Sequence, residues 1–255
     1  MCLLLISYNC HPAYPLIVAA NRDEFYNRPT EKAHFWKDHP KLLAGRDLEA
    51  GGTWLGVTKK GRFAAVTNYR DMRTLKEKAV SRGELVTNFL LSELSPLKYG
   101  RILSTRAKEY NGYNLLSADM ESLYYFSNQT NKLEKLQDGV YGLSNHLLDT
   151  PWRKVIKSKE AFINVTAGEK ILTDDLFKIL SDDKEAPDDQ LPDTGLPPEI
   201  EKAVSPVFVK SEQYGTRAST VLLINRANEV LFIEKSLNMK SNEWEGSRFE
   251  FKLEL

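Results

Sequence analysis

Cys2, the second residue of the sequence, can supply a nucleophile and a base within one residue. The initiator methionine is removed from chains whose second residue is small, and cysteine qualifies, so we expect the mature chain to begin at Cys2. A thiol has a pKa of about 8.5 and an α-amine a pKa of about 7.7 to 8, so the amine can accept the thiol proton near neutral pH. A retained Met1 would turn this amine into an amide and remove the base.

A polar cluster, Asn21-Arg22-Asp23-Glu24, follows the second apolar run of the chain. A hairpin of residues 3–7 and 16–20 would place this cluster beside the chain terminus. There a carboxylate could hold the amine, and a guanidinium could bind an anion. The same residues could instead form a surface ion-pair loop around a buried structural cysteine, because buried free cysteines are common.

The elements that would position these groups follow from hydrophobic periodicity. A second hairpin is expected at 54–58 and 62–67, and the polar stretch 21–49 is expected to be a functional loop. Helices are expected after the caps Ser81, with Glu84 completing a capping box, and Ser95, and again from Pro151 and Thr173. The remaining strands are expected at 113–118, 123–127, 132–136, 140–144, 219–224, 230–234 and 248–253. Blocks of antiparallel strands alternating with blocks of helices favour an α+β fold, with residues 1–255 forming a single domain and two sheets packed face to face between outer helices.

Two segments have biased charge. Residues 181–206 hold five prolines and eight acidic residues against two lysines, which is typical of a mobile surface loop, or else of a lid over a pocket. Residues 59–82 hold eight basic residues against Asp71 and Glu77, which is typical of a solvated loop but could also attract an anionic ligand.

The bulk composition narrows the class of protein. Lys+Arg and Asp+Glu are both 35, so a nucleic-acid partner is not expected. The two cysteines and four histidines contain no zinc-binding spacing, and neither a disulfide framework nor a cofactor is expected. The short apolar run 3–6 lacks a basic leader, and no window reaches the length of a transmembrane helix. We therefore expect a cytoplasmic protein.

Other motifs are weaker. Gly51 and Gly56 lack the lysine that a phosphate-binding loop requires, and Gly142-Leu143-Ser144-Asn145 is followed by His146 rather than by the glycine of a serine-hydrolase elbow. His146 could act as a general base, but a lone histidine after a strand is more often a surface or capping residue.

A series of short motifs runs in order along nearly the whole chain. They are Met1-Cys2-Leu3, Asn21-Arg22-Asp23-Glu24-Phe25, Arg28-Pro29, Gly45-Arg46-Asp47, Gly51-Gly52-Thr53-Trp54-Leu55-Gly56, Thr67-Asn68-Tyr69-Arg70, Ser81-Arg82-Gly83-Glu84-Leu85, Tyr113-Asn114-Leu115, Gly142-Leu143-Ser144-Asn145, Pro151-Trp152 and Gly215-Thr216-Arg217. In this series the sequence resembles the NRDE family, also called the transport and Golgi organisation family after its eukaryotic members.

This resemblance implies a four-layer αββα sandwich of the N-terminal-nucleophile (Ntn) hydrolase type, in which a terminal cysteine cleaves non-peptide amide bonds through an acyl-enzyme. It implies that Cys2 is the nucleophile, that Asp23 lies near the amine, that Asn145 stabilises the oxyanion and that Arg217 lies in the pocket. In the relatives, the arginine near the N-terminus precedes the asparagine of this motif, whereas here Arg22 follows Asn21. The substrate-binding positions expected alongside the catalytic ones are Asn21, Arg22, Glu24, Arg28, Asn68 and Arg70, with Asn68 a possible second oxyanion donor.

Two classes of function remain open. The first is a hydrolase of amide or thioester bonds in a small acyl-bearing metabolite. The second is a non-catalytic binding or trafficking protein for haem, lipid or acyl-coenzyme A, because members of the family are implicated in haem or lipid homeostasis. Cys2 and the scattered histidines form no recognisable haem motif, so the sequence neither favours nor excludes a haem site.

Overall fold

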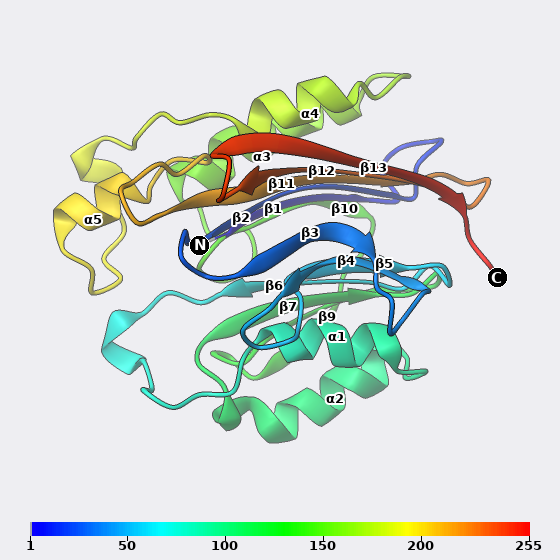
Figure 1. Cartoon of the computed structure of the whole chain (residues 1–255), viewed down its shortest axis with the longest axis horizontal. Helices are drawn as coiled ribbons and strands as arrows, with labels where there is room; N and C mark the ends of the chain where they lie inside the picture. The colour runs from blue at the N-terminus through cyan, green and yellow to red at the C-terminus, as the bar shows by residue number, and fades with distance from the viewer. Residues whose placement is uncertain (1) are drawn as a thin grey trace. The chain divides into compact units, whose positions relative to one another are not determined.

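The structure is a computed structural model that describes residues 2–255, and of Cys2 it describes the backbone. The chain forms two compact units, which are described separately (Figure 1). The first unit contains residues 2–27 and Asp138–Glu250, and the second contains Arg28–Gln137 and Phe251–Leu255. That the whole chain acts as one domain stays a prediction.

The first unit is a six-stranded sheet with helices on one face. The strand order is β10-β1-β2-β11-β12-β13, and β1, β2, β10 and β11 pair antiparallel. The strands are β1 (Cys2–Tyr8), β2 (Leu16–Phe25), β10 (Gly139–Leu143), β11 (Tyr214–Ile224), β12 (Glu229–Asn238) and β13 (Glu243–Lys252, which ends in the second unit). The helices are α3 (Arg153–Thr166), α4 (Thr173–Leu180) and α5 (Pro198–Ala203), with a short turn of 3₁₀-helix, η3 (Asp188–Gln190). Helices α3 and α4 cover the sheet (Figure 1).

Alternate strand residues form the core between this sheet and its helices. Leu3 and Leu5 of β1 pack with Phe162 of α3 and Leu176 of α4 in one buried cluster. Successive side chains of a strand point to opposite faces of the sheet. A continuous apolar run such as that of β1 is therefore typical of a strand that is buried on both faces. All four of its residues from Leu3 to Ile6 are buried, as predicted.

The second unit is a seven-stranded antiparallel meander, β3-β4-β5-β6-β7-β8-β9, with two helices. The strands are β3 (Thr30–Phe35), β4 (Leu42–Asp47), β5 (Leu55–Thr58), β6 (Phe63–Asn68), β7 (Tyr113–Ala118), β8 (Leu123–Ser127) and β9 (Lys132–Lys135). The helices are α1 (Gly83–Leu91) and α2 (Pro96–Arg106), and η1 (Met72–Thr74) and η2 (Ala107–Glu109) are single 3₁₀ turns.

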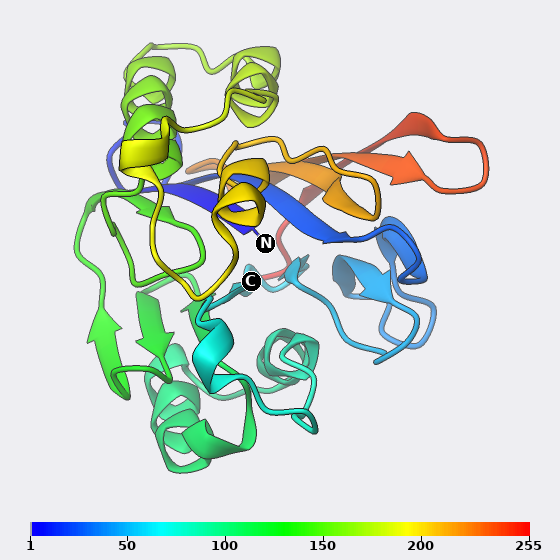
Figure 2. The ribbon, with the colours of Figure 1, turned by 90° about the vertical axis from the view of Figure 1, so that its left-hand side faces the viewer.

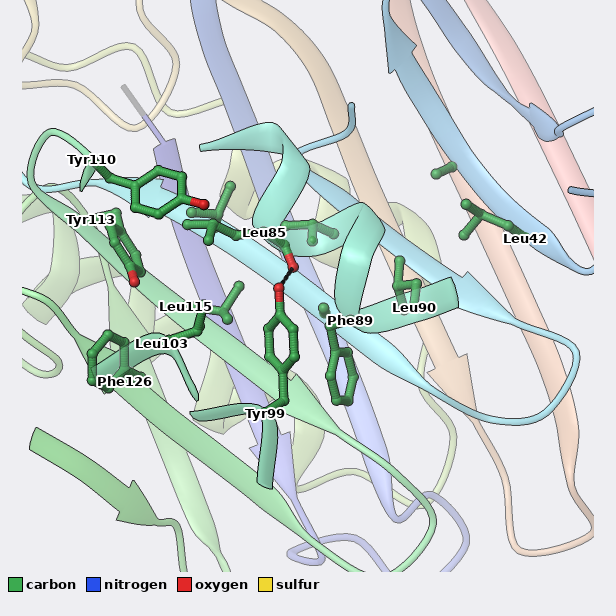
Figure 3. Close-up of a cluster of buried hydrophobic side chains, with 14 of the residues drawn as sticks. Leu42, Leu85, Phe89, Leu90, Tyr99, Leu103, Tyr110, Tyr113, Leu115 and Phe126 are labelled. Carbon is green, nitrogen blue, oxygen red and sulfur yellow. Dashed lines mark hydrogen bonds between the residues drawn. The ribbon is translucent and has the colours of Figure 1, made fainter. Parts of the chain in front are cut away.

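The core of the second unit is rich in aromatic rings (Figure 3). The Tyr99 hydroxyl of α2 donates a 2.7 Å hydrogen bond to the Leu85 carbonyl of α1, which ties the two helices together. The buried Arg62 guanidinium stacks 4.1 Å from the Phe89 ring centre and donates to the Phe89 and Leu94 carbonyls at 2.9 and 2.7 Å. A cation placed at a helix C-terminus both satisfies its free carbonyls and interacts favourably with its dipole.

Several expectations were wrong in detail. The stretch 21–49 is not one loop, because β2 runs to Phe25 and β3 and β4 follow it. The capping box at Ser81 is absent: the N-cap position is Arg82, and the Glu84 carboxylate accepts the Tyr110 hydroxyl instead. Residues 181–206 are not a bare loop, since they contain η3 and α5. The cap at Ser95 is confirmed.

Candidate functional site

Strand pairing in the first unit places the start of β1, the end of β2 and the end of β10 at the same end of the sheet. Cys2 pairs with Arg22 across β1 and β2. On its other side, β1 pairs with β10 up to Leu4 and Leu143. Strand β10 ends at Leu143, and Asn145 follows two residues later, after this end of the sheet.

Arg217 joins this end through a β-bulge. Thr216 pairs with Asp23 and Ala218 pairs with Arg22, so Arg217 is the extra residue between them. Bulges redirect side chains and are frequent beside active sites. The Arg217 side chain is buried, and its Nη1 atom donates a 3.2 Å hydrogen bond to the Phe25 carbonyl.

Asp23 is a buried carboxylate in β2. Its Oδ1 atom accepts a 2.6 Å hydrogen bond from the Thr216 hydroxyl of β11. Burial raises the pKa of the Asp23 carboxyl, because removing water disfavours the charged form. The positive charges of Lys154 and Arg22 and the Thr216 hydrogen bond act in the opposite direction.

The other members of the polar cluster contact protein groups. The buried Asn21 amide donates to the Leu180 and Val207 carbonyls at 2.7 and 2.8 Å and accepts the Ser219 hydroxyl at 2.7 Å. These three bonds favour a positioning role for Asn21, and its predicted contact with substrate stays a prediction. Next along the strand, the side chain of Arg22 forms a 3.5 Å ion pair with Glu24.

Lys154, in the first turn of α3, was not identified from the sequence. It is 5% exposed, and its ammonium donates to the Val204 and Pro206 carbonyls at 2.9 and 3.0 Å. A signal was available, because Lys154 lies four residues before Ser158 and eight before Phe162, on the buried face of the helix. Lysine is rarely buried without partners, so a lysine on the apolar face of a helix indicates a buried polar interaction.

Residues 204–209 link these side chains. Lys154 holds the Val204 and Pro206 carbonyls, Asn21 holds the Val207 carbonyl, and Val209 exchanges two hydrogen bonds with Thr216. The same Thr216 hydroxyl that accepts the Val209 N–H donates to Asp23. One buried hydrogen-bond network therefore fixes Asp23 with respect to β11 and α3.

Asn145 lies two residues after the end of β10 and is fully buried. The Ser144 hydroxyl donates to the Asn145 Oδ1 atom at 3.4 Å, which leaves the amide N–H₂ as the donor end of the side chain. Its neighbour His146 lies 2.8 Å from the Thr150 hydroxyl, and burial lowers the pKa of its imidazole.

Three predicted substrate-binding residues belong to the second unit. Arg28 forms a 2.7 Å ion pair with Asp47 and a 3.3 Å ion pair with Glu49, so its contacts favour a structural role. Asn68 is the last residue of β6, and Arg70 is buried two residues later. Binding of substrate by these residues stays a prediction.

Several motif glycines and tryptophans have a structural explanation in the same unit. A Cβ atom on Gly45 would lie 2.3 Å from the Trp54 ring, and one on Gly52 would lie 2.5 Å from the Gly83 backbone. These positions need glycine because other chain segments approach closely. Packing therefore explains the glycines at these two positions.

Within residues 2–255 as described, no group of three or more His, Cys, Asp and Glu residues lies together as a metal site. Among the same residues, no helix has the length and apolar character needed to span a bilayer.

The comparisons with known proteins agree with this architecture. The family model described as Transport and Golgi organisation 2 matches residues 1–239. The Transport and Golgi organization 2 homolog of Mus musculus is 37% identical over 276 aligned residues, with all of both chains covered. The Bos taurus homolog is 38% identical over 280, again with full coverage. The Drosophila melanogaster protein is 29% identical over 278, with 98% of each chain covered.

A solved structure resembles the whole chain. The mutant C2A conjugated bile acid hydrolase from Clostridium perfringens matches with a TM-score of 0.52 and 11% identity, covering 100% of this chain and 99% of that one. This likeness concerns the fold and confirms the predicted α+β, Ntn-hydrolase type. The family model and the mammalian relatives show that the chain belongs to the Transport and Golgi organisation 2 family.

Proposed function

We infer that this protein is an N-terminal cysteine hydrolase that cleaves an amide or thioester bond in a small acyl-bearing metabolite. The observation that carries the inference is the strand register, which brings the Cys2 backbone, Asp23, Asn145 and the bulged Arg217 to one end of a sheet. The inference is also supported by the fold of the solved neighbour, a conjugated bile acid hydrolase that carries the mutation C2A.

The proposed reaction starts with removal of Met1. The α-amine of Cys2 takes the thiol proton, and the thiolate attacks the acyl carbonyl carbon. The Asn145 amide N–H donates to the resulting oxyanion, a contribution of about 3 kcal/mol in comparable sites. Collapse breaks the C–N or C–S bond, and the leaving amine or thiol takes the proton from the ammonium. This leaves the acyl group on the Cys2 sulfur as a thioester. Water, deprotonated by the same amine, then attacks this thioester; its C–S bond breaks, the acid is released and the Cys2 thiolate takes the proton back from the ammonium.

Asp23 and Arg217 have supporting roles in this scheme. Asp23 would hold and orient the α-ammonium as it forms, and the Thr216 bond and the Lys154 charge favour the ionised carboxylate that this role requires. Arg217 would bind an anionic group of the substrate, because a guanidinium presents several donors to a carboxylate or phosphate. Reducing conditions in the cytoplasm suit a free thiol nucleophile, so we place the activity there.

The experiment is a turnover assay on protein that lacks Met1. Intact-mass measurement verifies the removal of Met1. N-acyl amides and acyl thioesters of several chain lengths are offered, and release of the free acid is measured. We expect hydrolysis by the wild type, and a loss of at least about 100-fold in Cys2→Ser because a hydroxyl is a much weaker nucleophile near neutral pH. Equal rates for wild type and Cys2→Ala would contradict the proposal.

A binding or trafficking protein for haem, lipid or acyl-coenzyme A is the second candidate. It is favoured by the names of the curated relatives, which refer to transport and Golgi organisation rather than to a reaction. A haem titration followed at the Soret band, repeated on Cys2→Ala, tests whether a haem site uses that thiol. Saturable binding of acyl-coenzyme A without any release of free acid would favour this candidate over the hydrolase.

A further inference from the structure

Residues 72–80 of the second unit, here called the 72–80 loop, expose aliphatic side chains between basic ones. The loop includes η1 and projects from the rest of its unit after the end of β6 (Figure 1), and Figure 2 shows it from its exposed side. Met72, Leu75 and Val80 are 42%, 47% and 41% exposed. Apolar side chains that are exposed singly are ordinary on a protein surface, whereas several on one short loop suit an interaction surface.

The loop is held in place at its base. The Lys76 N–H donates to the Asn111 side chain at 2.8 Å, and the Asn111 amide donates back to the Lys76 carbonyl at 3.2 Å. Val80 forms a parallel bridge with Tyr110. These contacts fix the backbone at the base of the loop, and the Met72 and Leu75 side chains remain partly exposed.

The charges around the aliphatic side chains are mainly positive. Arg73, Lys76, Lys78 and the adjacent Lys108 are exposed. The acidic residues of the segment are Asp71, which forms a 2.9 Å ion pair with Arg73, and Glu77. The Lys76 ammonium reaches the carbonyls of Lys108 and Tyr110, so the loop and the segment after α2 form one surface. Long basic side chains can place an apolar stem in lipid and a charge at the headgroups.

We propose that the 72–80 loop docks on a membrane surface rich in anionic lipid, with Met72 and Leu75 inserted among the acyl chains and the surrounding cations on the headgroups. Aliphatic insertion combined with basic residues is the pattern of interfacial membrane binding. A stable protein interface buries about 800 Å² on each partner, more than a few separate tips on a short loop can offer. Two copies of this cationic surface would repel each other, and aliphatic tips contribute nothing to binding a phosphodiester backbone.

This docking would have a consequence for the second unit. The loop begins just after Asn68 and Arg70, which are predicted to bind substrate. A loop seated on lipid would bring that end of β6 toward the bilayer. The proposal stands independently of the hydrolase, since a trafficking protein would need the same contact.

The test is sedimentation of the full chain with phosphatidylcholine vesicles that contain or lack about one third phosphatidylserine. We expect binding that requires phosphatidylserine and weakens with added salt. Met72→Asp with Leu75→Asp should weaken binding by at least about 30-fold. Lys78→Gln with Lys108→Gln should weaken it by about 25-fold, from about fivefold for each charge removed.

The matched control is Leu48→Asp with Met239→Asp, a second exposed leucine and methionine outside the loop, 51% and 40% exposed. This pair should bind as the wild type does, and circular dichroism melts should show that all variants fold. Equal loss of binding in the control, unchanged binding of the Met72 and Leu75 variant, or equal binding to vesicles without phosphatidylserine would overturn the proposal.

Discussion

Replacing Lys154 by Met tests whether the buried network organises the candidate site. Methionine has a similar volume but no charge or donor, so the change leaves the buried Val204 and Pro206 carbonyls without their 2.9 and 3.0 Å partners. A hydrogen bond to a charged group contributes about 1.5 to 3 kcal/mol. Burial of the apolar methionine offsets part of this loss, so we expect a net destabilisation of about 3 kcal/mol.

Thermal unfolding measures the effect. For a chain of this size each kcal/mol lowers the Tm by about 2 to 4 °C, so Lys154→Met should melt about 6 to 12 °C below the wild type. Lys159→Met, on the same helix, removes a half-buried ion pair with Asp149 at 2.8 Å and should cost less than about 1 kcal/mol.

The pH dependence adds a second readout. Burial raises the pKa of Asp23 and the Lys154 charge opposes that shift, so the variant should raise this pKa further. A native state that binds more protons than the unfolded state loses stability as the pH rises above the unfolded pKa of about 3.9. The deficit of Lys154→Met should therefore be larger at neutral than at acidic pH. If Lys154→Met melted within about 2 °C of Lys159→Met at every pH, the reasoning would be refuted.

Three further results are expected. Gly45→Ala should destabilise the protein by about 1 to 3 kcal/mol in a urea titration, because its Cβ would overlap the Trp54 ring, whereas Gly246→Ala, with open space around it, should be nearly neutral. Asp23→Asn should gain Tm relative to the wild type as the pH rises from about 4 to 7, because ionising the buried carboxyl costs stability above its unfolded pKa; a constant difference would contradict this. Asn145→Ala should lower the turnover rate about 100-fold, with little change in KM, if its amide stabilises the oxyanion.

The apolar runs of the sequence were sufficient to predict most elements. Residues 3–7 and 16–20 form the expected hairpin, and strands form at all four positions expected between Tyr113 and Leu143. They are not one meander, because β7, β8 and β9 belong to the second unit whereas β10 pairs with β1 in the first. Burial on both faces gives such strands a clear signal. The strand from Thr30 to Phe35 was missed, because it is an edge strand with exposed polar residues and lacks that signal.

The polar residues of the site were harder to interpret. Asn21 and Asp23 were expected in a loop, but hydrogen bonds to distant groups such as Val207 and Thr216 allow them to be buried in a strand. Such partners lie more than 180 residues away in the chain, and local pattern does not identify them. The bulge that redirects Arg217 likewise depends on the register with β2.

The measurement that tests the central claim most directly is the intact mass of the protein after exposure to an acyl-reactive probe. The probe is applied to a Cys10→Ala background, since Cys10 is an exposed free thiol. We predict that the chain lacks Met1 and gains one acyl group, that the group maps to the N-terminal peptide, and that Cys2→Ala in the same background gains none. A retained Met1, or equal acylation of the Cys2→Ala protein, would contradict the account.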